Sequence, residues 1–334
     1  MKKSIFVILW FIHCSAQAAD MPGIPAFIDE MVTKHQFKRE ELQLAFSRAE
    51  YRAEVIESIS KPAILKPWVE YRPNFINPKR IDGGVQYWKK YSAALKRAEQ
   101  KYGVPQEIIL GVIGVETLYG RNAGRYLALD ALTTLTFDYP RRADFFREEL
   151  EHYLLLAREQ GFDLLGIQSS YAGALGIPQF MPSSYRRYAV DHNGNGRIDL
   201  MSEPEDAIGS VANYLKQYGW QSGEPVALQS TVEDERRLGT VGDVRPYIAW
   251  RDAGVTPLKK PDADMPPAWL LDFTVENGKE YWLVFSNFNV IMRYNNSNYY
   301  AMSVYQLADA VRRAKGLGIP EGKQAARTTV QARP

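Results

Sequence analysis

Apolar residues recur at helical spacing over much of the chain. In FKREELQLAFSRA, the apolar residues Leu42, Leu44, Ala45 and Phe46 lie among charged positions, a pattern typical of an amphipathic helix. The same periodicity predicts helices over residues 24–60, 84–102, 141–160, 204–218 and about 303–316. Gly103 and Gly161 suit helix ends. One further helix is expected from Pro105, which suits a first helical position, to Gly120.

Three regions depart from the helical pattern. Residues 61–79 hold four prolines and cannot form one helix, so we expect an extended segment on the surface. Residues 166–190 are rich in Gly, Ser, Pro and aromatics, which predicts a loop opening into short helices. Residues 223–292 contain strand-like runs of β-branched and aromatic residues. The expected fold is mainly α (α+β), with a small β-containing segment late in the chain and no internal repeat.

The first residues are typical of a secretory signal peptide. Lys2 and Lys3 precede the apolar stretch SIFVILWFI, and small residues lead to Ala18, after which we expect cleavage. A stretch of nine residues is too short to span a bilayer, and no later apolar run reaches 18 residues. We therefore expect a soluble or peripherally attached mature protein.

Cys14 is the only cysteine of the chain and allows two interpretations. It is removed with the signal peptide, or it becomes the lipidated first residue of a bacterial lipoprotein. Phe11, Ile12 and His13 match a lipobox poorly, which favours removal. Neither interpretation provides a disulfide framework.

Charge and missing motifs exclude several function classes. Residues 1–18 hold two of the 41 Lys and Arg residues and none of the 39 Asp and Glu residues, so the mature chain is neutral. Neutrality argues against nucleic-acid binding. No zinc-binding HExxH, nucleophile GxSxG or phosphate-binding GxxxxGK[ST] motif occurs. Carboxylate acid–base chemistry remains, and the 12% aromatic share suits sugar stacking.

Glu116 is the best candidate for that chemistry. It ends an almost wholly apolar run in GVIGVETLYG, and desolvation raises a carboxyl pKa toward that of a general acid. Gly111 and Gly114 each weaken a helix by about 1 kcal/mol relative to Ala, which indicates close approach by a backbone or a ligand. The alternative is a structural Glu that pairs with an arginine such as Arg121 or Arg125. When only this run is considered, the structural alternative is favoured.

The stretch SSYAGALGIPQFMPSSY offers neutral hydrogen-bonding groups beside apolar ones. Ser170, Tyr171 and Gln179 could bind a sugar, while Gly173 and Gly176 allow unusual turns. Without further context, an ordinary tight loop is the favoured interpretation.

Four motifs in order carry a family resemblance: GVETLYG, SSYAGALGIPQFMPSSYRRYAVD, DAIGSVANYL and RYNNSNYYAMSV. From about residue 22 to 316 the chain resembles the membrane-bound lytic murein transglycosylase B family (glycoside hydrolase family 103). The resemblance implies a lysozyme-like α core with one helical and one β-containing flanking segment. It also implies cleavage of the β-1,4 bond between N-acetylmuramic acid and N-acetylglucosamine in peptidoglycan, with the muramic C6 hydroxyl attacking C1 to leave a 1,6-anhydro end.

The resemblance also assigns roles to residues. Glu116 matches the family's single catalytic Glu, which acts as general acid and then as base. The positions that match the family's groove are Ser170, Gln179, Tyr214, Tyr294, Asn295 and Tyr300. Ile177 and Pro178 stand where the family has Tyr-Gly, and the usual lipobox is absent. One carboxylate suffices if the substrate's acetamido group stabilises C1, whereas ordinary glycosidases need two.

The stretch DHNGNGRIDLMSEPED resembles an EF-hand calcium loop. Its oxygen donors fit positions 1, 3, 5 and 7, but Ser202 stands at position 12, where Glu is usual. The family's lengthened loop implies a last ligand at Asp206. The expected ligands of a stabilising Ca²⁺ ion are Asp191, Asn193, Asn195, Arg197 through its carbonyl, and Asp206. The alternative is a polar turn that binds no metal. No cofactor is expected for catalysis.

The expected division of the chain follows these patterns. It comprises a signal peptide (1–18), an N-terminal helical segment (19–103), a lysozyme-like catalytic core (104–222) with an EF-hand-like loop (191–206), a β-containing segment (223–292), a return to the core with the final helix (293–318) and a disordered tail (319–334).

The leading interpretation is a monomeric lytic transglycosylase of the periplasm that acts on peptidoglycan strands. It binds no nucleic acid, and membrane association is limited to peripheral contact or a lipid anchor. The alternatives are a non-catalytic peptidoglycan-binding protein, a hydrolytic lysozyme and a calcium-responsive module. An outer-membrane lipoprotein is the less favoured location.

Overall fold

The computed structural model describes residues 21–61, 66–239, 242–259 and 265–316. The expected signal peptide, Cys14 and the expected disordered tail lie outside these residues. No helix in the described ranges is both long and apolar enough to cross a membrane.

The chain forms two compact units, each built from separate segments. Of the described residues, the first comprises 21–61, 124–174 and 181–183, and the second comprises 66–123, 175–180 and those within 184–316. These units are groups of segments that pack together, whereas the division expected above runs along the sequence. The expected domain boundaries stay a prediction.

The first unit is mostly helical. Its elements are α1 (Ile24–His35), α2 (Arg39–Arg48), α3 (Ala53–Ser60), β1 (Tyr126–Leu127), α8 (Ala128–Asp138), η3 (Pro140–Arg142), α9 (Ala143–Gln160) and β2 (Gln168–Ser169). The predicted helical run 24–60 is thus three helices, with Gln36 in the left-handed region after α1. Asp130, fully buried on α8, accepts hydrogen bonds from Arg52 Nε (2.9 Å) and Nη2 (2.7 Å). This ion pair compensates the buried charge.

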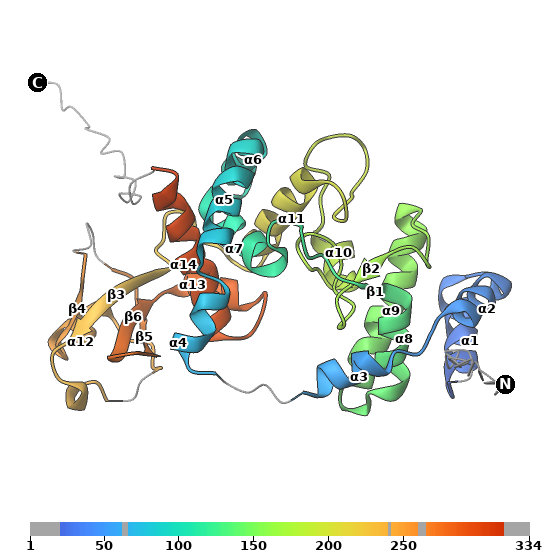
Figure 1. Ribbon diagram of the computed structural model, residues 1–334, viewed down its shortest axis with the longest axis horizontal. Helices are drawn as coiled ribbons and strands as arrows, with labels where there is room; N and C mark the ends of the chain where they lie inside the picture. The colour runs from blue at the N-terminus through green and yellow to red at the C-terminus, as the bar shows by residue number, and fades with distance from the viewer. Residues whose placement is uncertain (1–20, 62–65, 240–241, 260–264, 317–334) are drawn as a thin grey trace, which may run out of the picture. The chain divides into compact units, whose positions relative to one another are not determined.

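The second unit contains the helices that carry most of the candidate residues. They are α4 (Trp68–Tyr71), η2 (Arg72–Asn74), α5 (Pro78–Lys90), α6 (Ser92–Tyr102), α7 (Gln106–Thr117), α10 (Pro182–Tyr188, whose first two residues belong to the first unit), α11 (Pro204–Gln217), α13 (Ser286–Met292) and α14 (Asn298–Ala314). The apolar helix α7 packs against α5, α6, α11 and α14 (Figure 1).

The expectation of an extended segment over residues 61–79 is wrong for its described part. Helices α4 and η2 form there, and α5 begins at Pro78. The prolines are tolerated because Pro67 caps α4, while Pro73 and Pro78 occupy the first turns of η2 and α5, where no intrahelical N–H bond is lost.

The sheet of the second unit has four antiparallel strands in the order β4-β3-β6-β5. They are β3 (Ala227–Val232), β4 (Val255–Pro257), β5 (Trp269–Val275) and β6 (Gly278–Val284). The short helices η4 (Glu235–Arg237) and α12 (Tyr247–Asp252) lie between β3 and β4. Trp250 of α12 and Leu270 and Leu283 of the sheet belong to one buried cluster. The predicted mainly helical fold with a small late sheet is confirmed (Figure 1).

Candidate functional site

Glu116 lies in the last turn of α7, one residue before the helix ends at Thr117. The preceding nine residues are almost all buried and apolar, while Glu116 keeps intermediate exposure. Burial raises the pKa of Glu116 to about 7, against lowering effects of a hydrogen bond from Tyr300 and the charge of Arg80. The predicted desolvation is present.

Helix α7 ends earlier than expected. Gly120 was the predicted end, but Leu118 and Tyr119 already have φ angles of 52° and 62°, so the left-handed turn starts right after Thr117. The two helix-weakening glycines have a packing role. A Cβ atom on Gly111 would lie 2.5 Å from the Val304 carbonyl oxygen of α14. The predicted close approach is therefore that of α14.

Tyr300 is the hydrogen-bond partner of Glu116. Its hydroxyl donates to Glu116 Oε1 at 2.5 Å, and Ser297 Oγ caps the helix by accepting from the Tyr300 amide at 3.3 Å. Burial, followed by the nearby Glu116 charge, raises the pKa of Tyr300 well above its usual value. Tyr300 is therefore a neutral donor whose hydrogen atom points at the carboxyl group.

Two further tyrosines that were predicted to bind in the groove form a chain of ring contacts with Tyr300. The Tyr294 ring stacks on it at 14° and 6.4 Å between centroids, and its hydroxyl donates to the Pro178 carbonyl at 2.6 Å. The Tyr214 ring lies 4.8 Å from that of Tyr294, and its hydroxyl donates to the Arg293 carbonyl at 2.7 Å. The structure thus brings these three tyrosines together with Glu116; their binding roles stay predictions.

Gln179 belongs to the short segment 175–180, which is fixed to the end of α7. Thr117 Oγ1 donates to the Ile177 carbonyl at 2.7 Å. Gln179 has a φ of 53°, and its Nε2 donates to the Ala123 and Gly176 carbonyls, both at 2.9 Å. The amide nitrogen is thus committed to the local fold, which leaves Oε1 as the atom that can accept from a ligand.

The other predicted groove residues have different surroundings. Asn295 is exposed in the second unit. Ser170 and Tyr171 belong to the first unit, where Ser170 Oγ accepts from the Ala172 and Ala174 amides at 3.3 and 3.1 Å. Tyr171 is 43% exposed. Ser170 therefore stabilises its own loop, while Tyr171 and Asn295 are available to a ligand.

Sequence reasoning missed two residues near Glu116. Arg80 of α5 donates through Nη1 to the Gly114 carbonyl of α7. Tyr71 of α4 has a raised pKa, first through burial and then through the Glu116 charge. Neither residue had a sequence signal. Arg80 binds backbone carbonyls, which no motif reveals, and Tyr71 lies in residues 61–79, where the four prolines predicted an extended surface segment.

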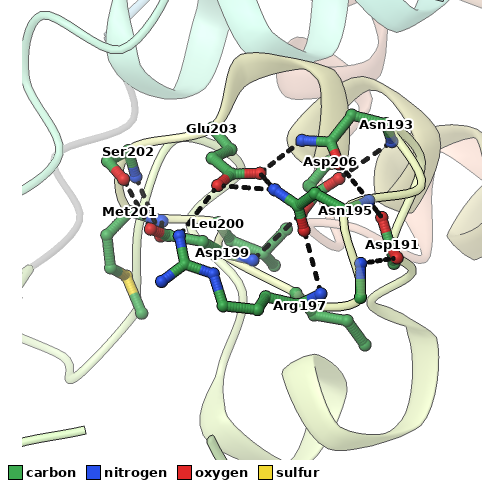
Figure 2. Close-up of polar contacts among 12 residues, drawn as sticks. Asp191, Asn193, Asn195, Arg197, Asp199, Leu200, Met201, Ser202, Glu203 and Asp206 are labelled. Carbon is green, nitrogen blue, oxygen red and sulfur yellow. Dashed lines mark hydrogen bonds and ion pairs between the residues drawn. The ribbon is translucent and has the colours of Figure 1, made fainter.

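The loop over residues 191–206 is organised by carboxylates (Figure 2). Asp191 accepts from the amides of Gly194 (2.7 Å), Asn195 (3.2 Å) and Gly196 (2.8 Å). These bonds, that from Gly196 first, lower the pKa of Asp191. The arrangement resembles the first ligand of a calcium loop, whose carboxylate also folds the loop around it.

Asp206 and Glu203 have distinct positions in this loop. The buried Asp206 carboxylate accepts from the amides of His192 (2.8 Å), Asn193 (3.3 Å) and Asp199 (3.0 Å). The Glu203 carboxylate accepts from the side-chain amides of Asn193 and Asn195 (Figure 2). Glu203, which was not a predicted ligand, therefore faces the two asparagines.

The donor set fits a hard cation in its chemistry. In the described part of the chain no three His, Cys, Asp or Glu side chains converge on a metal position, but calcium loops also use amide and backbone carbonyl oxygens. Asn193 and Asn195 would present their oxygens after a turn of the amide groups whose nitrogens now face Glu203.

The chain is similar in sequence to known lytic transglycosylases. The chain matches the model described as Transglycosylase SLT domain over residues 20–309. It is 44% identical over 307 residues to membrane-bound lytic murein transglycosylase B of Escherichia coli (strain K12), covering 89% of this chain and 84% of that protein.

Solved structures agree with this match. The soluble lytic transglycosylase SltB1 from Pseudomonas aeruginosa is 48% identical, with a TM-score of 0.82 over 88% of this chain and 100% of that one. Escherichia coli lytic transglycosylase Slt35, solved in complex with calcium, is 44% identical, with a TM-score of 0.83 over 90% of this chain and 96% of that one. The chain therefore belongs to the transglycosylase SLT domain family, and the family assignment predicted from its motifs is confirmed.

Proposed function

We propose that this protein is a lytic murein transglycosylase. It cleaves the β-1,4 bond between N-acetylmuramic acid and N-acetylglucosamine and leaves a 1,6-anhydromuramic acid end. The observation that carries the proposal is Glu116, a partly exposed residue whose carboxyl group has a pKa of about 7 and accepts a hydrogen bond from Tyr300. Family membership over residues 20–309 supports the same function.

In the first step Glu116 acts as general acid. A pKa of about 7 leaves about half of the carboxyl protonated at neutral pH. Because Tyr300 donates to Oε1, the acidic proton resides on Oε2. Glu116 gives this proton to the glycosidic oxygen as the bond from C1 to that oxygen breaks.

In the second step the Glu116 carboxylate acts as base. It takes the proton of the muramic C6 hydroxyl as that oxygen forms a bond to C1, which restores the protonated acid. Among the described residues, the groups that shift the pKa of Glu116 include no second carboxylate. This favours stabilisation of C1 by the substrate's own acetamido group.

The glycan strand contacts the neutral residues around the acid. Tyr300 holds the carboxyl, and the exposed Asn295 orients the acetamido group without adding charge. In the second unit, which holds Glu116, the proposed binding residues are Gln179, Tyr214, Tyr294, Asn295 and Tyr300; in the first unit they are Ser170 and Tyr171.

The loop over residues 191–206 binds a structural Ca²⁺ ion in this proposal. The relative Slt35 was solved with calcium, and the oxygen donors of this loop suit the same ion. Asp191, Asn193, Asn195, the carbonyl of Arg197 and Asp206 would hold it, and its contribution is to the stability of the loop. No proton transfer involves it.

The protein acts as a monomer in the periplasm after loss of residues 1–18. Its partner is the peptidoglycan strand, and any membrane association is peripheral. Lipidation of Cys14 would instead make it an outer-membrane lipoprotein, the less favoured alternative.

Digestion of purified sacculi by residues 19–334, analysed by mass spectrometry, tests the function. We expect products about 18 Da lighter than hydrolysis products and without a reducing end, because the C6 hydroxyl replaces water. Glu116→Gln should fold but lose at least about 10³-fold in rate. Glu107→Gln is the matched control, an acid at the other end of α7 that pairs with Arg312.

Each other outcome supports a named alternative. Products with reducing ends would identify a hydrolytic lysozyme. Binding of the glycan without cleavage by the unsubstituted protein would identify a peptidoglycan-binding protein. Activity of Glu116→Gln close to that of the control would remove Glu116 from the mechanism.

A further inference from the structure

We propose that Arg80 is a positioning residue for Glu116. Its guanidinium group holds the last turn of α7 in place and supplies the positive charge that stabilises the Glu116 carboxylate between the two proton transfers. This inference rests on the proposed function, because only a residue that alternates between acid and base needs its charged form stabilised in an apolar site.

The Arg80 side chain is held in one orientation. Asn77 caps α5 by accepting from the Arg80 amide at 3.1 Å. Arg80 Nε donates to the Asn74 carbonyl at 3.0 Å, and the guanidinium carbon lies 5.2 Å from the centre of the Phe75 ring. These contacts direct the remaining nitrogen atoms toward α7.

The guanidinium group binds the end of α7 just before Glu116. Nη1 donates to the Gly114 carbonyl and lies 3.5 Å from the Val115 carbonyl oxygen. The Gly114 carbonyl also accepts from the Leu118 amide at 3.3 Å, but the last carbonyl groups of a helix carry partial negative charge, so a cation stabilises this end. Because Glu116 follows these two carbonyls directly, their position fixes the backbone from which its side chain extends toward Tyr300.

Arg80 is also the one cation among the groups that shift the pKa of Glu116 in the described part of the chain. The other titratable groups whose pKa values respond to the charge of Glu116 are Tyr71 of α4, Tyr294 after α13 and Tyr300 of α14. Burial raises the pKa of all three, so they stay neutral. Tyr119, which responds to Arg80, is neutral for the same reason.

Among the residues that the structure describes, Arg80 forms no ion pair with a carboxylate that would compete for its charge. Burial lowers the pKa of Arg80. A guanidinium group nevertheless stays protonated in proteins. The positive charge is therefore available to Glu116, whose carboxylate forms as the first proton leaves.

The test compares Arg80→Gln with Arg80→Lys. Arg80→Gln should lower kcat by about 10²-fold with little change in KM, because it removes a preorganised charge that contacts no sugar. The basic limb of the pH–rate profile should move up by about one pH unit, since an opposite charge is lost. Arg80→Lys keeps the charge, so its basic limb should stay near that of the unsubstituted protein while kcat recovers only in part.

A second measurement does not depend on activity. NMR titration of ¹³C-labelled Glu, with the Glu116 signal assigned by Glu116→Gln, should show a higher Glu116 pKa in Arg80→Gln. Arg312→Gln is the control, because Arg312 contacts the other end of α7 through Glu107. Its titration and pH profile should match those of the unsubstituted protein.

The outcomes separate this inference from the proposed function. An unmoved Glu116 titration and basic limb in Arg80→Gln would overturn the role of Arg80, whatever the products are. Active Glu116→Gln would overturn the proposed function instead. If Arg80→Gln does not fold, Arg80→Lys decides: a kcat equal to that of the unsubstituted protein would show that the two carbonyl contacts position nothing.

Discussion

Two opposing effects set the pKa of the Glu116 carboxyl group at the end of α7. Its apolar surroundings favour the neutral acid, while Tyr300 and Arg80 favour the carboxylate. The sequence predicted the first effect from the apolar run before Glu116. It could not predict the second, because Tyr300 lies 184 positions away and Arg80 acts through backbone atoms. Side chains of distant helices set the balance, and only the fold brings them together.

The raised pKa of Glu116 predicts a pH-dependent cost to stability. The folded-state pKa of about 7 exceeds the ordinary value of 4.5, so the folded state binds the proton more tightly. The free energy of unfolding should therefore fall as pH rises from about 4.5 to 7 and then level off. Glu116→Gln lacks this titration and should become more stable than the unsubstituted protein by at most about 3 kcal/mol at pH 8.

Urea unfolding of both proteins at pH 4 and pH 8 checks this. The stability difference should be small at pH 4 and larger at pH 8. A difference that is the same at both pH values would mean that the carboxyl group titrates normally in the folded protein.

At the scale of elements, sequence patterns located most helices and some of their ends. Gly103 and Gly161 follow α6 and α9 as predicted, in left-handed conformations. The end of α7 was missed, because Leu118 and Tyr119 adopt the left-handed region without a sequence signal. Tertiary contacts, such as the bond from Thr117 to the Ile177 carbonyl, impose this end.

The contact between α7 and α14 gives a prediction about Gly111. Alanine favours an isolated helix by about 1 kcal/mol, but its Cβ atom would lie 2.5 Å from a backbone oxygen of α14, which cannot move without moving the helix. Gly111→Ala should therefore destabilise the protein by about 1–3 kcal/mol through overpacking. Gly83→Ala is the comparison, since its nearest neighbour is the Tyr119 ring at 3.2 Å.

Thermal unfolding monitored by circular dichroism measures both variants. A lower melting temperature for Gly111→Ala than for Gly83→Ala is expected. If Gly111→Ala is the more stable of the two, α14 does not limit the space beside α7.

At the scale of the whole molecule, the two units come from interleaved segments, which linear patterns could not reveal. The chain passes from the first unit to the second after Lys61 and returns at Gly124. Local periodicity identifies helices but not which of them pack together. The four family motifs supplied that information indirectly, and the fold class they implied is confirmed.

Stability of the whole protein should depend on Ca²⁺ through the loop over residues 191–206. A ligand that binds only the folded state adds about 2.7 kcal/mol at a concentration 100 times its Kd, so Ca²⁺ should raise the melting temperature above that in EDTA. Asp191→Ala should lose this increment. It should also lower the melting temperature somewhat in EDTA, because Asp191 accepts three backbone amides without any metal.

The size of the two losses distinguishes a metal ligand from a loop-folding residue. Differential scanning calorimetry in Ca²⁺ and in EDTA should give a clearly larger loss in Ca²⁺ for Asp191→Ala, and equal losses for Asp252→Ala, an exposed control outside the loop. If Asp191→Ala lowers the melting temperature equally in Ca²⁺ and in EDTA, the loss of its hydrogen bonds to backbone amides explains the whole effect. The loop would then be a polar turn that folds by itself, and Glu203 would face the two asparagines as a structural hydrogen-bond acceptor.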